Sequence, residues 1–201
     1  MTFSSKQNLE VVMVKLTAKE LHALVKPLAN ARYEVDYGWR YLEKALVDIE
    51  KDYGLDLTPD FQRGHVWTRE QQQAYIENSM RGVVSSAGMV IQFNCCNWHD
   101  ASQKKDSDLP EGFQCIDGLQ RLTAVREYLA GNVKPFGMAV DEWDGTDWDT
   151  RRIQFRLKFA VYDFQYRYEV LDHYLALNAG GTPHPPEEIE RVRALRAAAQ
   201  R

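Results

Sequence analysis

Apolar residues recur along this chain with two different spacings, one typical of helices and one typical of strands. In residues 155–164, apolar side chains occupy every second position from Phe155 to Val161, as one buried face of a strand requires. Thr17, three residues before Glu20, has the spacing of a capping box that starts a helix. We expect helices over residues 17–28, 41–49 and 168–178 and after Pro185-Pro186, and strands over residues 11–16, 88–93, 113–116 and 155–164.

The junction between a short apolar stretch and a helix, in residues 115–126, carries the strongest functional signal. It runs through Asp117 and Gly118 into an amphipathic helix with Gln120 and Arg121 in its first turn. A helix N-terminus presents unpaired N–H groups and a partial positive charge, so an acid and an arginine there could hold a metal–phosphate pair. The alternative is that Asp117 is only an N-cap and Gly118 only relieves a tight turn.

The helical period separates the faces of this helix. At about 100° per residue, Leu122, Val125 and Leu129 form one apolar stripe. Gln120 points away from the stripe and is therefore not predicted to be a core residue. Arg121 lies at the edge of the stripe, where its guanidinium can reach an oxygen ligand at the mouth of the helix.

A second Gln-Arg pair, Gln62 and Arg63, lies in residues 57–68, between a predicted strand and a predicted helix. A third feature is Asn178, followed by Gly-Gly-Thr at residues 180–182. The three segments read, in order, P-x-F-Q-R-x-x-x-W, D-G-x-Q-R-L-T and N-x-G-G-T. This order resembles the ParB/sulfiredoxin superfamily, and within it the N-terminal domain of GmrSD-type modification-dependent restriction proteins.

The resemblance implies a single domain of α+β class, a ParB/sulfiredoxin-like mixed sheet flanked by helices, that binds and hydrolyses a nucleoside triphosphate. Carried over position by position, it nominates Gln62, Arg63 and Gly118 for nucleotide binding and Asp117, Gln120 and Arg121 for catalysis. In this interpretation the arginines neutralise phosphate oxygens, Asp117 holds Mg²⁺ or orients water, and the glutamines position the nucleotide or the attacking water. Leu119 stands where sulfiredoxins have their reactive cysteine, so sulfinic-acid reduction is not expected and nucleotide hydrolysis is less well supported than binding. His65 is expected to be a structural histidine.

Composition fits one compact unit. The chain has 201 residues, 44% of them hydrophobic, and we expect one domain over residues 1–201, with residues 1–8 disordered and residues 97–111 forming an exposed loop. No segment has the roughly 18 consecutive apolar residues of a membrane span, and the N-terminus lacks a signal-peptide core, so a cytoplasmic protein without a membrane partner is expected. The odd number of cysteines does not indicate a secreted disulfide framework, and Cys95 and Cys96 lack the spacing of a structural zinc site.

Charge suggests where partners could bind. A net charge of −4 argues against a surface devoted to nucleic acid, yet arginines crowd the C-terminal helix. Arg191, Arg193 and Arg196 are candidate contacts to DNA, and the alternative is a solvated helix with cations favoured near its C-terminus. The acidic residues 141–149 are expected to form turns anchored by tryptophans, or else an acidic surface for a partner.

Three functional classes follow. The first is a nucleoside-triphosphate-binding and hydrolysing module of restriction or phage-conflict type, and the second is a ParB-like DNA-associated nucleotide switch. The third is a non-catalytic adaptor or inhibitor that binds a partner protein. Full restriction proteins of the resembled type carry a separate H-N-H nuclease domain, and because the sequence has no such segment, DNA cleavage is not expected from this chain alone; a nuclease or host protein would act in trans.

Overall fold

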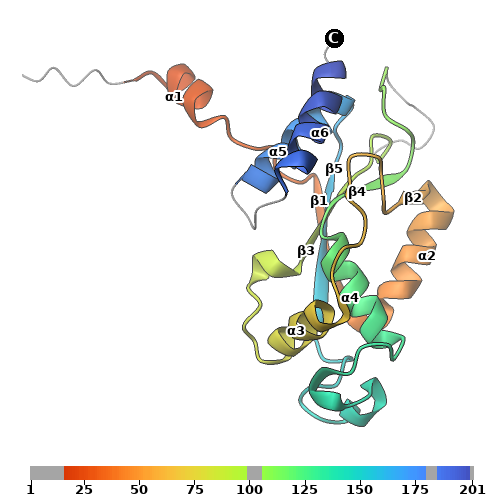
Figure 1. The fold of residues 1–201 in the computed structure, drawn as a ribbon. Coiled ribbons are helices and arrows are strands. Elements are labelled where there is room, and N and C mark those ends of the chain that lie inside the picture. The colour runs from red at the N-terminus through yellow and green to blue at the C-terminus, as the bar shows by residue number, and fades with distance from the viewer. Residues whose placement is uncertain (1–15, 99–105, 180–184, 200–201) are drawn as a thin grey trace, which may run out of the picture.

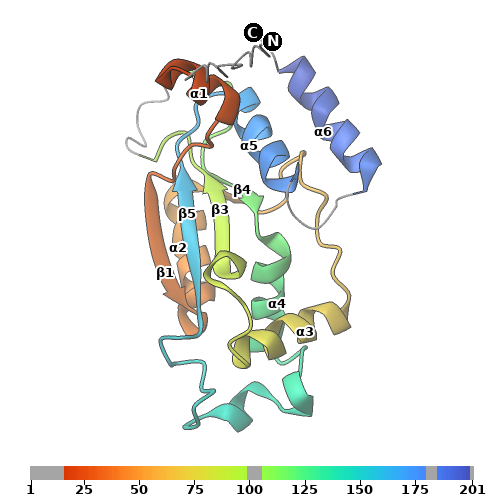
Figure 2. The same ribbon diagram turned by 90° about the vertical axis from the view of Figure 1, so that its left-hand side faces the viewer.

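The computed structural model describes residues 16–98, 106–179 and 185–199 (Figures 1 and 2). Several predictions fall outside the described residues: the disorder of residues 1–8, nearly all of the strand over residues 11–16, and the Gly-Gly-Thr at residues 180–182.

The described strands form one mixed sheet of five strands in the order β1-β5-β3-β4-β2. The strands are β1 (Tyr33–Gly38), β2 (Leu55–Asp56), β3 (Val90–Asn94), β4 (Phe113–Asp117) and β5 (Arg156–Tyr162). β5 pairs antiparallel with β1 and parallel with β3, while β4 pairs antiparallel with β3 and parallel with β2. The sequence patterns predicted β3, β4 and β5, but β1 was missed, because it is an edge strand without a fully buried residue.

Helices cover both faces of this sheet. The α-helices of the described residues are α1 (Ala18–Val25), α2 (Leu42–Tyr53), α3 (Arg69–Met80), α4 (Leu119–Leu129), α5 (Arg167–Ala179) and α6 (Pro186–Ala198). Short 3-10 helices are η1 (Trp39–Tyr41), η2 (Ser86–Met89), η3 (Pro135–Gly137) and η4 (Val140–Trp143). In Figure 1, α2 and α4 lie on one side of the sheet, and α5 and α6 lie on the other.

Each face of the sheet has its own apolar core. The first core joins the sheet to α2, α3 and α4 through Leu46, Ile76, Leu122, Phe93 and Phe159, among others. The second core joins it to α5 and α6 through Phe61, Ile116, Tyr162, Leu171 and Val192, among others. The alternation predicted for β5 is confirmed, since Leu157, Phe159 and Val161 all face the first core. The α+β class and the mixed sheet flanked by helices are likewise confirmed.

Two predictions made from short sequence patterns agree with the structure. The capping box of Thr17 and Glu20 starts α1, although α1 buries none of its own residues. The tryptophans of the acidic segment act as anchors, because Trp148 donates from Nε1 to the Met80 carbonyl at 3.1 Å and packs on Trp143. No helix among the described residues has the length and apolar character needed to cross a membrane.

Within the predicted exposed loop over residues 97–111, Asp108, Pro110 and Glu111 are exposed, but two other residues are not. Asn97 and Leu109 are buried, with 5% and 1% of their surface exposed. The Asn97 side-chain oxygen accepts hydrogen bonds from the Gly112 N–H and the Cys95 thiol, so it closes the base of the loop from inside. A polar residue with its hydrogen bonds satisfied is buried at little cost, which polarity alone does not reveal.

Candidate functional site

The turn from β4 into α4 requires a glycine. Gly118 is the N-cap of α4 and has φ +101°, a left-handed conformation that L side chains rarely adopt. A Cβ on Gly118 would lie 2.7 Å from Ile91 Cδ1 and 3.1 Å from the Val90 carbonyl oxygen. The alternative role of Asp117 as N-cap is therefore wrong: β4 continues through Asp117, which pairs with Gln92, and the helix starts one residue later than that role requires.

The carboxylate of Asp117 faces Arg121 one helical turn away. The Arg121 guanidinium donates to Asp117 Oδ2, and the Arg121 side chain is 22% exposed. Arg121 Nε is buried and, among the described residues, has no hydrogen-bond partner. The N-terminus of α4 also has no side-chain cap, so an uncapped helix N-terminus lies beside a guanidinium that is only partly paired.

Both motif glutamines hold backbone in place. Gln62 donates from Nε2 to the carbonyls of Cys115 and Ile116, at 3.1 and 2.7 Å. Gln120 accepts from the N–H groups of Val66 and Trp67 with Oε1, both at 3.0 Å. It also donates from Nε2 to the Gly64 carbonyl at 2.7 Å. The two amides thus fasten the loop after β2 to the β4–α4 junction.

This fastening determines the position of Arg63. The residue lies between Gln62 and the stretch held by Gln120, and it is half-buried. Within the described part of the chain, the Arg63 guanidinium makes neither a hydrogen bond nor an ion pair. Its positive charge lowers the pKa of Tyr174, although burial dominates and raises that pKa to about 12, so the hydroxyl stays protonated.

All six nominated residues line one cavity of about 480 Å³. The same cavity is lined by α5 through Tyr174, Leu177 and Asn178, so the described parts of the three motifs meet there. Gln92 and Tyr174 were missed by sequence reasoning, although Gln92 is a polar residue inside an apolar strand and could have been noticed. The volume is within the range of small-molecule and cofactor sites.

Gln92, a half-buried residue that lines the cavity, contacts a buried histidine outside the lining. Gln92 Oε1 lies 2.8 Å from His173 Nε2, and His173 is 4% exposed. Burial lowers the pKa of His173, partly opposed by the charge of Asp117. A neutral imidazole therefore fixes the side-chain orientation of Gln92, which faces the cavity.

The remaining candidates have structural partners. His65 Nε2 lies 2.8 Å from Gln72 Nε2, a contact that fits the structural role expected of it. The C-terminal arginines are each paired with a carboxylate: Arg191 with Glu188, Arg193 with Glu190 and Arg196 with Asp172. These acids neutralise the face suggested for DNA, so the geometry favours the alternative of a solvated helix.

Metal ligands are sparse near the cavity. Among the described residues no group of three or more His, Cys, Asp or Glu side chains could hold a metal. Asp117 is the one carboxylate among the described residues that line the cavity, and Mg²⁺ commonly takes most of its oxygens from phosphates and water. Cys95, Cys96 and Cys115 are buried. Burial raises the pKa of Cys95 to about 12 and also raises the pKa of Cys115, so neither of these two is a reactive thiolate.

Comparison with known families supports the motif assignment. A family model described as "GmrSD restriction endonuclease, N-terminal domain" matches residues 42–191, about three quarters of the chain. The matched range contains all three motifs but not β1. Comparisons with curated proteins and with solved structures found no match.

Proposed function

This chain belongs to the family of the N-terminal domain of GmrSD restriction endonucleases, and on that premise we propose that it is a nucleoside-triphosphate-binding module of restriction or phage-conflict type. The observation that carries the proposal is the convergence of Arg63, Arg121 and the uncapped N-terminus of α4 on one cavity. Two guanidinium groups and a helix N-terminus together form a strong site for a polyphosphate.

The parts of the cavity suit different parts of a nucleotide. Arg63 and Arg121 are the cationic groups, while Trp67, Val90 and Leu177 provide apolar surface in the same cavity. An aromatic side chain next to apolar ones favours a planar base, whereas the guanidinium groups favour phosphate oxygens. The Arg121 side chain lines the cavity and is 22% exposed, so its guanidinium can donate to a phosphate oxygen there.

Hydrolysis is the finer part of the proposal, and here the residues act mainly by electrostatics. The two arginines neutralise the charge that develops on the phosphate oxygens, and Asp117 orients water or completes the shell of a Mg²⁺ ion. Bound Mg²⁺ would supply Lewis-acid stabilisation of the phosphate oxygens. The glutamines act through the loop that they fix, since their amides already bind backbone groups.

Binding is tested by a thermal-shift panel of all nucleoside triphosphates with and without Mg²⁺. A ligand present at about 100 times its dissociation constant should stabilise the folded protein by about 2.7 kcal/mol. Arg63→Ala should weaken binding by roughly tenfold to a hundredfold, because a charge-assisted hydrogen bond contributes about 1.5–3 kcal/mol. Arg193→Ala is the matched control, since Arg193 is 62% exposed on α6 and does not line the cavity. No shift with any nucleotide, or equal losses in both variants, would reject the site.

Turnover is tested separately with Asp117→Asn. Asparagine keeps the size of the side chain but removes the charge that a metal or a positioned water requires. Nucleotide affinity should persist while phosphate release falls by at least about tenfold, equivalent to about 1.4 kcal/mol in the barrier. If the parent protein releases no detectable phosphate, the hypothesis of hydrolysis is refuted and only nucleotide binding stands.

A further inference from the structure

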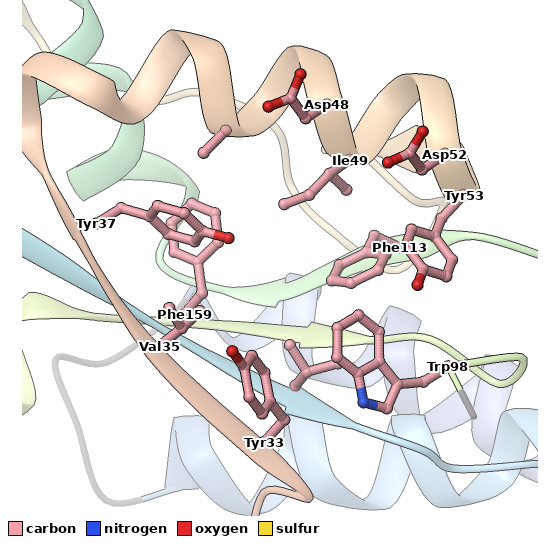
Figure 3. A pocket seen from close by; sticks show the side chains of 12 residues that line it. Tyr33, Val35, Tyr37, Asp48, Ile49, Asp52, Tyr53, Trp98, Phe113 and Phe159 are labelled. Carbon is pink, nitrogen blue, oxygen red and sulfur yellow. The ribbon is translucent and has the colours of Figure 1, made fainter.

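A second cavity, of about 200 Å³, lies between α2 and the β1–β5 edge of the sheet (Figure 3). It shares no lining residue with the nucleotide cavity. The apolar side chains in its lining include Val35 and Phe159 from the sheet and Ile49 from α2. The β1 residues that line it lie outside the matched family range, so this cavity is not part of the shared motifs.

Aromatic rings from three separate segments form one wall of this cavity. The Tyr33 and Trp98 ring centroids are 5.3 Å apart, and those of Trp98 and Tyr53 are 5.5 Å apart. Successive rings are tilted by 32° and 33°, so the wall is curved rather than flat. Phe113 packs edge-on against Trp98 and fixes its position. Tyr33 remains 44% exposed, which leaves the cavity accessible from solvent.

The α2 side of the cavity carries two carboxylates. Asp48 and Asp52 stand on the helix above the rings in Figure 3. Asp48 is paired with the exposed Lys44 at 2.9 Å, whereas Asp52 has no ion pair among the described residues. Burial is the main cause of the raised pKa of the Tyr37 hydroxyl, and Tyr33 and Asp48 add to it. The cavity is therefore both aromatic and negative.

We propose that this cavity binds a methylated ammonium group, such as a quaternary ammonium headgroup or a methylated lysine side chain. Ring faces attract a cation, and Trp98 supplies the strongest such face. The methyl groups would contact the apolar side chains of the lining, and Asp52 would balance the charge without requiring a hydrogen bond. A phosphate or carboxylate ligand is disfavoured by the two acids, and an uncharged apolar ligand makes no use of them.

The probe is choline, followed by NMR of its N-methyl protons during titration with the full chain. Binding over ring faces should move this signal upfield, and the neutral isostere 3,3-dimethyl-1-butanol should bind at least about fivefold more weakly. A short peptide with trimethyllysine, compared with its unmodified lysine form, distinguishes a protein side chain from a small-molecule headgroup as the source. Tighter binding of the peptide identifies the former, and tighter binding of choline identifies the latter.

Variants identify the groups responsible. Tyr33→Leu keeps apolar bulk but removes a ring face, and should weaken choline binding at least about fivefold. Tyr41→Leu is the matched control, since Tyr41 is 63% exposed and does not line the cavity. Asp52→Asn should weaken choline but leave the neutral isostere unchanged. Equal affinity for choline and the isostere, equal losses in both tyrosine variants, or no binding of either cation would overturn the proposal. Nucleotide binding is measured separately, so it does not affect this result.

Discussion

Gln120 offers the sharpest test of how the site is assembled. Its amide makes three hydrogen bonds to the backbone of Gly64, Val66 and Trp67, all more than 50 residues away in sequence. A net contribution of about 0.5–1.5 kcal/mol for each bond gives about 1.5–4.5 kcal/mol for the set. Val66 is exposed, so water can replace its bond, and we expect Gln120→Ala to cost about 2 kcal/mol.

Urea unfolding measures this loss of unfolding free energy, provided that the m-value is the same in the variant and the parent. In a chain of this length, a loss of about 2 kcal/mol lowers the melting temperature by roughly 4–8 °C. Gln73→Ala is the matched control, because Gln73 is a half-buried helical glutamine with one side-chain hydrogen bond, to Glu77. Gln120→Glu keeps the two accepted bonds but sets a carboxylate against the Gly64 carbonyl, so its stability should fall as well. A loss for Gln120→Ala no larger than that of Gln73→Ala would show that the loop does not depend on this amide.

Gly118→Ala should destabilise the fold by about 3 kcal/mol or more, because alanine would adopt a left-handed conformation and its Cβ would press against the Ile91 backbone. Chemical unfolding measures this loss. Gly145→Ala is its control, because Gly145 has φ +77° but open space around its Cβ, so its cost should be only about 1 kcal/mol; similar losses would refute the packing argument. The lowered pKa of His173 predicts that stability declines as pH falls below 6.5, because the unfolded chain then binds a proton that the folded chain does not. Melting temperatures of the parent and of His173→Gln between pH 7.5 and about 5 test this, and the difference between them must change with pH in that window.

Much of the fold could be predicted from the sequence where one side of an element is fully buried. Helices α2 and α5 and strands β3, β4 and β5 all contain several buried apolar side chains, and their positions were predicted to within about four residues. Strand β1 could not be predicted on this basis, because its alternation leaves Tyr33 and Val35 only partly covered. The burial of Asn97 depended on two hydrogen bonds within the folded loop, which no local pattern encodes.

In the candidate site, too, the residue types predicted which residues gather, but only the fold shows what each of them does. The two Gln-Arg pairs look equivalent in sequence, and both were expected to act directly on a nucleotide. In the fold, the glutamines fix the backbone and the arginines line the cavity. At Gln120 the residue type decides this, because its amide both donates and accepts whereas a guanidinium only donates. A backbone segment that needs both a donor and an acceptor is therefore held by glutamine. Arg63, beside that segment, remains available to bind an anion. Loss of Gln120 should therefore weaken nucleotide binding by displacing Arg63 rather than by removing a ligand contact.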